Sequence, residues 1–303
     1  MSIKDNIFEL GKQAKNASIQ MKLCSNNQKN KALSNLIKNI LKNKNRILEA
    51  NNIDLENGKK KSLSNPLMNR LTLTDKSIEG LVKSIEDIIT IPDPIGLTLE
   101  EWERPNGLKF RKISTPLGVL GVIYESRPNV TVDASCLSIK SGNCIILRGG
   151  SDSFYSSKEL VNNISLAFSD AGLPNHCVQM IDTPEREAVD YLLSMQDYVD
   201  VIIPRGGKSL IEKINSASKI PVIKHLDGIC HVYVDKDADL KIAEKVVFNS
   251  KMRRPEICGA AETLLIDSNL KDKAMEILQP LKNVNCEIRG DEFIQSLDKD
   301  FKK

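Results

Sequence analysis

The first ninety residues repeat apolar side chains at helical spacing. One run comprises Leu33, Ile37, Ile40, Leu41, Ile47 and Leu48, and a second comprises Leu71, Ile78, Leu81, Ile85, Ile88 and Ile89. This spacing predicts amphipathic helices, with Asp75 at the start of the last one. Pro92, Pro94 and Gly96 end the helical region, because proline and glycine do not continue a helix.

Residues 99–114 change to an alternation of large apolar and charged side chains. Asn106-Gly107 lies near the middle of this stretch, and Asn-Gly is a strong signal for a tight β-hairpin turn. The pattern predicts two half-exposed strands that form a protruding hairpin. Such a hairpin is either a subunit contact or a simple surface feature, and the pattern alone allows both.

From residue 116 onward, short apolar segments alternate with helical patterns. The expected strands are 118–124, 144–148, 178–181, 199–203, 230–234, 262–267 and 285–288. The expected helices are 131–140, 153–171, 185–195, one that opens after 204–209, 239–248 and 271–281. This alternation predicts an α/β fold whose doubly wound, mainly parallel sheet carries helices on both faces.

Composition adds little about partners. Hydrophobic residues make up 41% of the 303 and charged residues 27%, a balance typical of soluble proteins of more than one domain. The net charge is +3, but residues 1–65 hold thirteen Lys and Arg against five Asp and Glu. This basic start is either a nucleic-acid arm or a solvated helical surface. We favour the surface, because no aromatic residues alternate with the charges as stacking platforms, and so expect no nucleic-acid partner.

The cysteines indicate neither disulfides nor a metal site. Seven are spread singly at irregular spacing, without a C-x-x-C pair. The sequence has no signal-peptide pattern and no apolar run long enough to span a bilayer. We therefore expect a reducing cytoplasm, no membrane partner and no metal.

Two expected strands end in a Gly-Gly turn that leads into a helix. The turns contain Arg148, Gly149, Gly150 and Ser151, and then Arg205, Gly206, Gly207, Lys208 and Ser209. Ligands of open α/β sheets bind beyond the carboxyl ends of strands, and helix N-termini attract phosphate. Neither turn is G-x-G-x-x-G, so a phosphate or nucleotide site and ordinary tight turns remain equally open.

A candidate nucleophile lies at Cys258, between Arg253-Arg254-Pro255 and Gly259-Ala260-Ala261. Nearby cations favour the reactive thiolate, and small residues allow close approach of a substrate. Taken alone, a single cysteine is more often an inert, buried small hydrophobe.

Several stretches together resemble the γ-glutamyl phosphate reductase family of the aldehyde dehydrogenase superfamily. The matching segments are Arg70-Leu71-Thr72-Leu73-Thr74, Ile91-Pro92-Asp93-Pro94-Ile95-Gly96, Arg104-Pro105-Asn106-Gly107-Leu108, the runs 116–134 and 140–150, Pro204-Arg205-Gly206-Gly207, and Arg254-Pro255-Glu256-Ile257-Cys258-Gly259-Ala260-Ala261-Glu262-Thr263. The resemblance covers nearly the whole chain, and the runs 124–134 and 147–150 are highly specific.

The resemblance implies two domains and a cysteine mechanism. Residues 1–227 would form the N-terminal helices and a Rossmann-like NADPH-binding domain with an oligomerisation hairpin, and residues 228–303 an incomplete α/β catalytic domain. Cys258 would attack L-glutamyl 5-phosphate to form a thioester, and NADPH would reduce that thioester to glutamate 5-semialdehyde. Asn129 would stabilise the oxyanion together with the Cys258 backbone N–H. NADPH would lie along the two Gly-Gly turns, with Arg148, Gly149, Gly150, Ser151, Arg205, Gly206, Gly207 and Ser209.

His225 begins His225-Leu226-Asp227-Gly228, where ordinary aldehyde dehydrogenases carry Glu-Leu-Gly-Gly and use the glutamate to hydrolyse the thioester. Its absence fits a reductase. His225 then has either a proton-transfer or cofactor-contact role, or it is a packed polar residue. Arg127, Arg253 and Arg254 are candidates for the phosphate or α-carboxylate of the substrate, with surface salt bridges as the alternative.

The chain also departs from the resemblance. Many relatives have Gly and Asn at positions 256 and 259, and Glu256 would oppose thiolate formation unless the neighbouring arginines compensate for its charge. Family members continue beyond position 303, so part of the catalytic domain is expected to be missing. The resemblance further implies a homo-oligomer and a functional association with glutamate 5-kinase. Alternatives are a related aldehyde dehydrogenase, or a non-catalytic chain that binds only nucleotide or a subunit.

Overall fold

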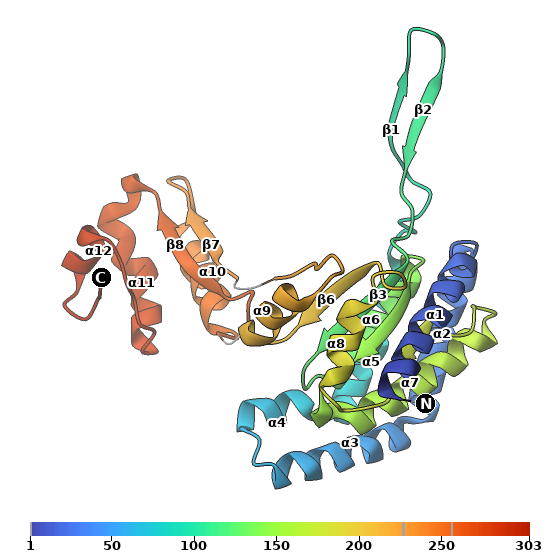
Figure 1. The fold of residues 1–303 in the computed structure, drawn as a ribbon. Helices are drawn as coiled ribbons and strands as arrows, with labels where there is room; N and C mark the ends of the chain where they lie inside the picture. The colour runs from blue at the N-terminus through green and yellow to red at the C-terminus, as the bar shows by residue number, and fades with distance from the viewer. Residues whose placement is uncertain (1, 226–227, 256) are drawn as a thin grey trace. The chain divides into compact units, whose positions relative to one another are not determined.

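The computed structural model describes residues 2–225, 228–255 and 257–303 (Figure 1). These residues divide into two compact units, Met1–Lys224 and His225–Lys303. The division lies three residues before the boundary placed after residue 227 from the sequence. Each unit has its own apolar core, and each is described by itself.

Five helices open the first unit, as the periodicity predicts. They are α1 (Ile3–Met21), α2 (Asn26–Lys42), α3 (Lys44–Lys60), α4 (Asn65–Leu71) and α5 (Asp75–Thr90). Ser2, Ser25 and Thr74 begin α1, α2 and α5 with capping boxes, in which the cap and the third helical residue satisfy each other's backbone N–H groups. Asp75 is therefore confirmed as the first residue of α5, with Thr74 as its cap.

Among the described residues of this unit, four parallel strands form a sheet in the order β5-β4-β3-β6. The strands are β3 (Val119–Tyr124), β4 (Cys144–Arg148), β5 (Val178–Met180) and β6 (Val201–Arg205). The connecting helices are α6 (Pro128–Lys140), α7 (Phe154–Asp170), α8 (Glu187–Ser194) and α9 (Lys208–Ala217). All residues of β3 and β4 are buried, which explains their uninterrupted apolar sequences.

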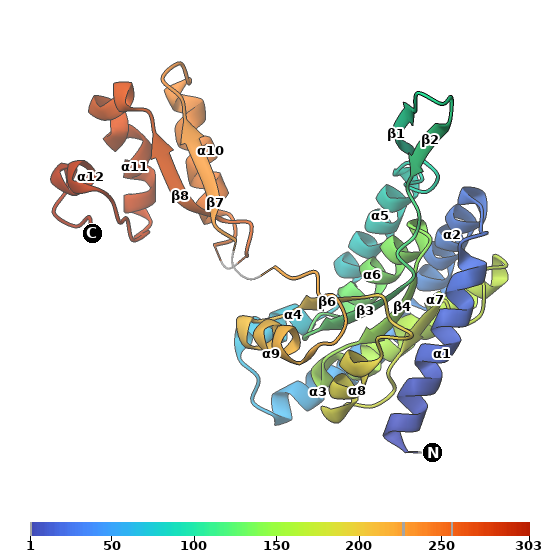
Figure 2. The same ribbon diagram turned by 45° about the horizontal axis from the view of Figure 1, so that its top comes forward.

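Helices cover both faces of this sheet (Figure 2). The chain moves outward from β3 through β4 to β5 and then returns to β6 on the other side of β3. Because such crossovers are right-handed, α6 and α7 lie on one face and α8 on the other. Helices α6 and α7 pack together, while α1 packs on the strands and against α8. The predicted α/β architecture with a parallel sheet is confirmed.

The register of the sheet brings three strand ends to one edge. Tyr124 at the end of β3 lies beside Arg205 of β6, and Ile123 lies beside Arg148 of β4. The turns that follow these strands, at 125–127, 149–150 and 206–207, are therefore neighbours. This edge contains most of the residues that the sequence assigns to the cofactor.

The hairpin also forms as predicted, from β1 (Thr98–Glu103) and β2 (Lys109–Ile113). Gly107 has a φ of 83°, the left-handed conformation that the turn requires. Every residue of both strands is exposed, and Trp102 stacks on Phe110 with ring centroids 5.4 Å apart. Figure 1 shows the hairpin extending from the first unit.

The second unit contains two parallel strands in its described part, β7 (Cys230–Val234) and β8 (Ala261–Ile266). Its helices are α10 (Leu240–Met252), α11 (Ala274–Asn283) and α12 (Glu292–Leu297), with a 3₁₀ helix at Ser268–Lys273. Helix α10 runs past its predicted end at residue 248, and α12 was not predicted.

The strand predicted at 285–288 is wrong. Asn285 adopts a left-handed φ of 58°, and the Cys286 N–H donates to the Leu281 carbonyl oxygen. These residues therefore cap the end of α11 instead of pairing in a sheet. Arg289 makes only an isolated bridge with Lys302. Across the described residues, no helix is both long and apolar enough to cross a membrane.

Candidate active site

Cys258 is an exposed free thiol in the loop between α10 and β8. Its carbonyl oxygen accepts a hydrogen bond from Cys230 Sγ at 3.5 Å, which ties the loop to the start of β7. Gly228 lies so close that a Cβ at this position would overlap the Cys258 carbonyl oxygen. These contacts are made by the Cys258 backbone, and the residue itself is exposed, so the buried, inert alternative does not describe Cys258.

Arg253 and Arg254 follow α10 directly and are both exposed. Within the described residues, neither guanidinium forms an ion pair, so a surface salt bridge is not observed for them. Lys251 is paired instead, with Glu262 at 3.1 Å. Glu256, whose charge was expected to oppose thiolate formation, lies outside the described residues.

Asn129 is the second residue of α6 in the first unit and is exposed. Its side-chain amide donates to Asp133 Oδ2 at 3.3 Å, and Ser84 Oγ donates to Asp133 Oδ1 at 3.0 Å. The turn that leads to it contains Ser126 at a φ of 37°, an unusual conformation for a residue other than glycine. Because Asn129 and Cys258 belong to different units, their shared oxyanion role stays a prediction. Arg127, half-buried, immediately precedes α6.

The first Gly-Gly turn is built for packing. Arg148 is only 8% exposed, and its guanidinium donates to the carbonyl oxygens of Gly149 at 2.6 Å and Pro184 at 2.9 Å. Burial lowers the pKa of Arg148, and the nearby charge of Arg186 adds to that shift. These contacts favour a structural role over the predicted phosphate contact.

The two glycines of this turn make room for the neighbouring β3 end. A Cβ on Gly149 would meet the Tyr124 ring at 3.1 Å, and one on Gly150 would meet the Ser126 nitrogen at 3.2 Å. Tyr124 is buried, and its hydroxyl hydrogen-bonds Thr131 Oγ1 at 2.6 Å. No role was predicted for Tyr124, although it begins the highly specific run 124–134. Ser151 is exposed at the start of the following 3₁₀ helix.

The second Gly-Gly turn is open to solvent. Its members are all exposed: Arg205, Gly206, Gly207, Lys208 and Ser209. Gly207 caps the ten-residue α9, and its backbone N–H donates to the carboxylate of Glu125 at 2.9 Å. The helix N-terminus thus already binds an anion supplied by the chain, as a phosphate site would. His225 is exposed in the second unit.

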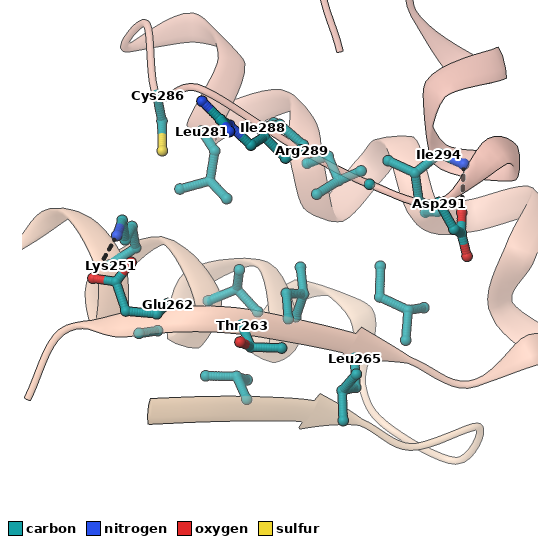
Figure 3. A pocket seen from close by; sticks show the side chains of 18 of the residues that line it. Lys251, Glu262, Thr263, Leu265, Leu281, Cys286, Ile288, Arg289, Asp291 and Ile294 are labelled. Atoms are coloured by element: carbon teal, nitrogen blue, oxygen red, sulfur yellow. Dashed lines mark hydrogen bonds and ion pairs between the residues drawn. The ribbon is translucent and has the colours of Figure 1, made fainter. Parts of the chain in front are cut away.

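A cavity of about 850 Å³ lies in the second unit, between β8 and α11 (Figure 3). Its lining includes Leu265, Leu281, Ile288 and Ile294, and ion pairs there join Lys251 to Glu262 and Arg289 to Glu287. None of the residues predicted from the sequence for catalysis or binding lines it. We therefore do not assign this cavity to the reaction. No group of three or more potential metal ligands occurs among the described residues.

Comparison with known proteins identifies the family. The Aldehyde dehydrogenase family profile matches residues 3–285. The gamma-glutamyl phosphate reductase of Paramagnetospirillum magneticum is 46% identical over 291 residues, which are 96% of this chain and 69% of that protein. The relative of the same name from Halothermothrix orenii is 42% identical and is matched over 100% of this chain and 73% of its own length.

Solved structures agree. The crystal structure of gamma-glutamyl phosphate reductase from Thermotoga maritima superposes with a TM-score of 0.89 at 35% identity, over 98% of this chain and 72% of that chain. An acetylating aldehyde dehydrogenase from Geobacillus thermoglucosidasius shares only the fold, at 17% identity and a TM-score of 0.62 over 97% of this chain and 61% of that one. The chain therefore belongs to the aldehyde dehydrogenase family and, within it, to the gamma-glutamyl phosphate reductases.

Proposed function

We propose that this chain catalyses the NADPH-dependent reduction of L-glutamyl 5-phosphate to L-glutamate 5-semialdehyde and phosphate, a step of proline biosynthesis. The similarity to reductases of that name over 96% of the chain carries the proposal. The exposed thiol of Cys258 supplies the nucleophile that this chemistry needs. No competing nucleophile was singled out from the sequence.

The covalent step belongs to Cys258. Its thiolate attacks the acyl carbon, a sulfur–carbon bond forms, the carbon–oxygen bond to phosphate breaks, and phosphate leaves. The side-chain amide of Asn129 and the Cys258 N–H stabilise the negative charge that develops on the acyl oxygen. After reduction, the sulfur–carbon bond breaks, which releases the aldehyde and restores the thiolate.

The residues at the sheet edge fit a nicotinamide cofactor in part. The turn after β6 offers exposed N–H groups at a helix N-terminus, with Arg205 and Ser209 beside it, and Gly207 already binds a carboxylate. The turn after β4 contributes Gly149, Gly150 and Ser151, whereas Arg148 is occupied by carbonyl oxygens. When bound there, NADPH supplies the hydride.

Position 225 supports reduction over hydrolysis. A histidine occupies the place at which hydrolysing members of the superfamily carry a glutamate, so the glutamate that activates water in those members is absent here. The thioester then persists long enough to be reduced. We also propose that Arg127, Arg253 and Arg254 bind the anionic groups of the substrate. The chain is further proposed to form a homo-oligomer and to associate with glutamate 5-kinase.

The reverse reaction tests the proposal. The 303-residue chain is mixed with L-glutamate 5-semialdehyde, NADP⁺ and phosphate, and formation of NADPH is followed by its absorbance. We expect NADPH to form only when phosphate is present, and Cys258→Ser to form none. Equal NADPH formation with and without phosphate would instead favour a hydrolysing aldehyde dehydrogenase. If neither the unmodified chain nor Cys258→Ser turns over, while both still bind NADPH, the result would favour a non-catalytic protein.

A further inference from the structure

A small polar cavity of about 270 Å³ lies in the first unit, at the N-terminal end of α6. Its polar lining consists of Arg70, Thr72, Ser77, Ser84, Asn129 and Asp133. One cationic side chain, one anionic side chain, three hydroxyls and an amide thus share a pocket with the predicted oxyanion donor. A pocket of this volume suits a small polar molecule better than a nucleotide.

Arg70 has a charge that no described residue neutralises. It lies in the last turn of α4 and is exposed, and within the described residues its guanidinium forms neither an ion pair nor a hydrogen bond. A planar guanidinium binds a carboxylate through two parallel hydrogen bonds. Arg70 is therefore suited to an anionic group of a ligand in this cavity.

Asp133 has the opposite charge and is half-buried. Its carboxylate accepts from two neutral donors, Ser84 Oγ at 3.0 Å and Asn129 Nδ2 at 3.3 Å. Among the described residues it has no cationic partner, although a carboxylate has about four acceptor positions. Asp133 therefore retains acceptor capacity for an ammonium group, while its bonds to Ser84 and Asn129 hold it in orientation.

We propose that this cavity binds the amino-acid end of the substrate, with Arg70 on the α-carboxylate and Asp133 on the α-ammonium group. The inference rests on the proposed function, because a glutamyl substrate carries both groups. Asn129 lines the same cavity, so the acyl end of the bound molecule would extend from there toward the reacting atoms. Acyl compounds that lack the amino-acid end would leave Arg70 and Asp133 unpaired, and the pocket would select against them.

Binding of unreactive ligands tests this pocket without requiring turnover. L-glutamate 5-methyl ester carries both charged groups, monomethyl glutarate carries only the carboxylate, and methyl 4-aminobutanoate carries only the ammonium group. Each is titrated into the 303-residue chain by calorimetry or NMR. We expect the 5-methyl ester to bind at least about tenfold more tightly than either half-ligand, since each lacks one charge-assisted interaction.

Two substitutions separate the roles. Arg70→Gln should weaken binding of the methyl ester and of monomethyl glutarate about tenfold and leave methyl 4-aminobutanoate unchanged. Asp133→Asn, which keeps the shape and an acceptor for Ser84, should weaken the ester and methyl 4-aminobutanoate and leave monomethyl glutarate unchanged. Arg70→Lys should restore part of the carboxylate binding. Arg46→Gln, an exposed arginine of α3 outside the pocket, is the matched control.

Loss of all three ligands to the same extent in both variants would indicate a structural effect and overturn the proposal. So would unchanged affinities, or equal binding of all three ligands by the unmodified chain. These outcomes are independent of Cys258 and of NADPH. If the chain shows the expected selectivity but no turnover, the pocket proposal holds and the proposed reaction is wrong. If the chain turns over without this selectivity, the proposed reaction holds and the pocket proposal is wrong.

Discussion

At the scale of single residues, two arginines with the same sequence context have different surroundings. Arg148 and Arg205 each end a strand before a Gly-Gly pair, and from the sequence both were assigned to phosphate. The structure buries Arg148 against carbonyl oxygens and leaves Arg205 exposed. The difference arises because the carbonyl oxygens of Pro184 and Glu185 accept hydrogen bonds from Arg148. Local sequence cannot predict it, because the carbonyl of Pro184 is 36 residues away.

Substitution separates these two roles. Arg148→Gln should lower the free energy of unfolding by about 2 kcal/mol, because buried carbonyl oxygens lose their donors. Arg205→Gln should change it by less than about 0.5 kcal/mol and should raise the KM for NADPH. Urea titrations and cofactor kinetics measure the two effects. If Arg148→Gln were as stable as the unmodified chain but bound NADPH poorly, Arg148 would be a phosphate ligand after all.

At the scale of elements, apolar periodicity was sufficient to predict the helical first ninety residues and the parallel strands of the first unit. Thr74 and Asp75, and the buried run of β3, show this most clearly. The expected strand at 285–288 failed because Asn285 turns left-handed and caps α11, and a short apolar run does not reveal that competition. No role was predicted for Gly228, because its role depends on contact with Cys258, thirty residues later.

Gly228 supports the nucleophile loop. Gly228→Ala should reduce kcat at least about tenfold, because the new methyl group must displace the Cys258 backbone, and small displacements of reacting groups are costly. Gly259→Ala is the matched control, since a Cβ at that position meets nothing within 4 Å. Steady-state kinetics on both variants provide the measurement. Equal rates for Gly228→Ala and the unmodified chain would show that this contact does not position Cys258.

At the scale of the whole molecule, the roles predicted from the sequence are divided between the two compact units. The resemblance named Cys258 and Asn129, which belong to separate compact units. Their shared oxyanion role therefore stays a proposal. The polar cavity around Arg70 and Asp133 was not predicted, because α4, α5 and α6 contribute to it from distant parts of the sequence.

The exposed hairpin offers a prediction about assembly. Trp102 and Phe110 stack on one face of it and are 39% and 40% exposed. If this face is a subunit contact, Trp102→Ser combined with Phe110→Ser should reduce the mass measured by sedimentation equilibrium. Glu101→Ser combined with Arg111→Ser is the control, because this neighbouring pair in the same register points to the opposite face. Identical masses for the two double variants and the unmodified chain would assign the hairpin to the surface alone.

The covalent role of Cys258 is best measured by intact-protein and peptide mass spectrometry. The chain is mixed with L-glutamate 5-semialdehyde and NADP⁺ in the absence of phosphate, quenched in acid and digested. We predict a glutamyl adduct on the peptide that contains Cys258, which disappears when phosphate is added before the quench and never forms in Cys258→Ser. An adduct on another residue, or phosphate-dependent NADPH formation that survives Cys258→Ser, would contradict the mechanism.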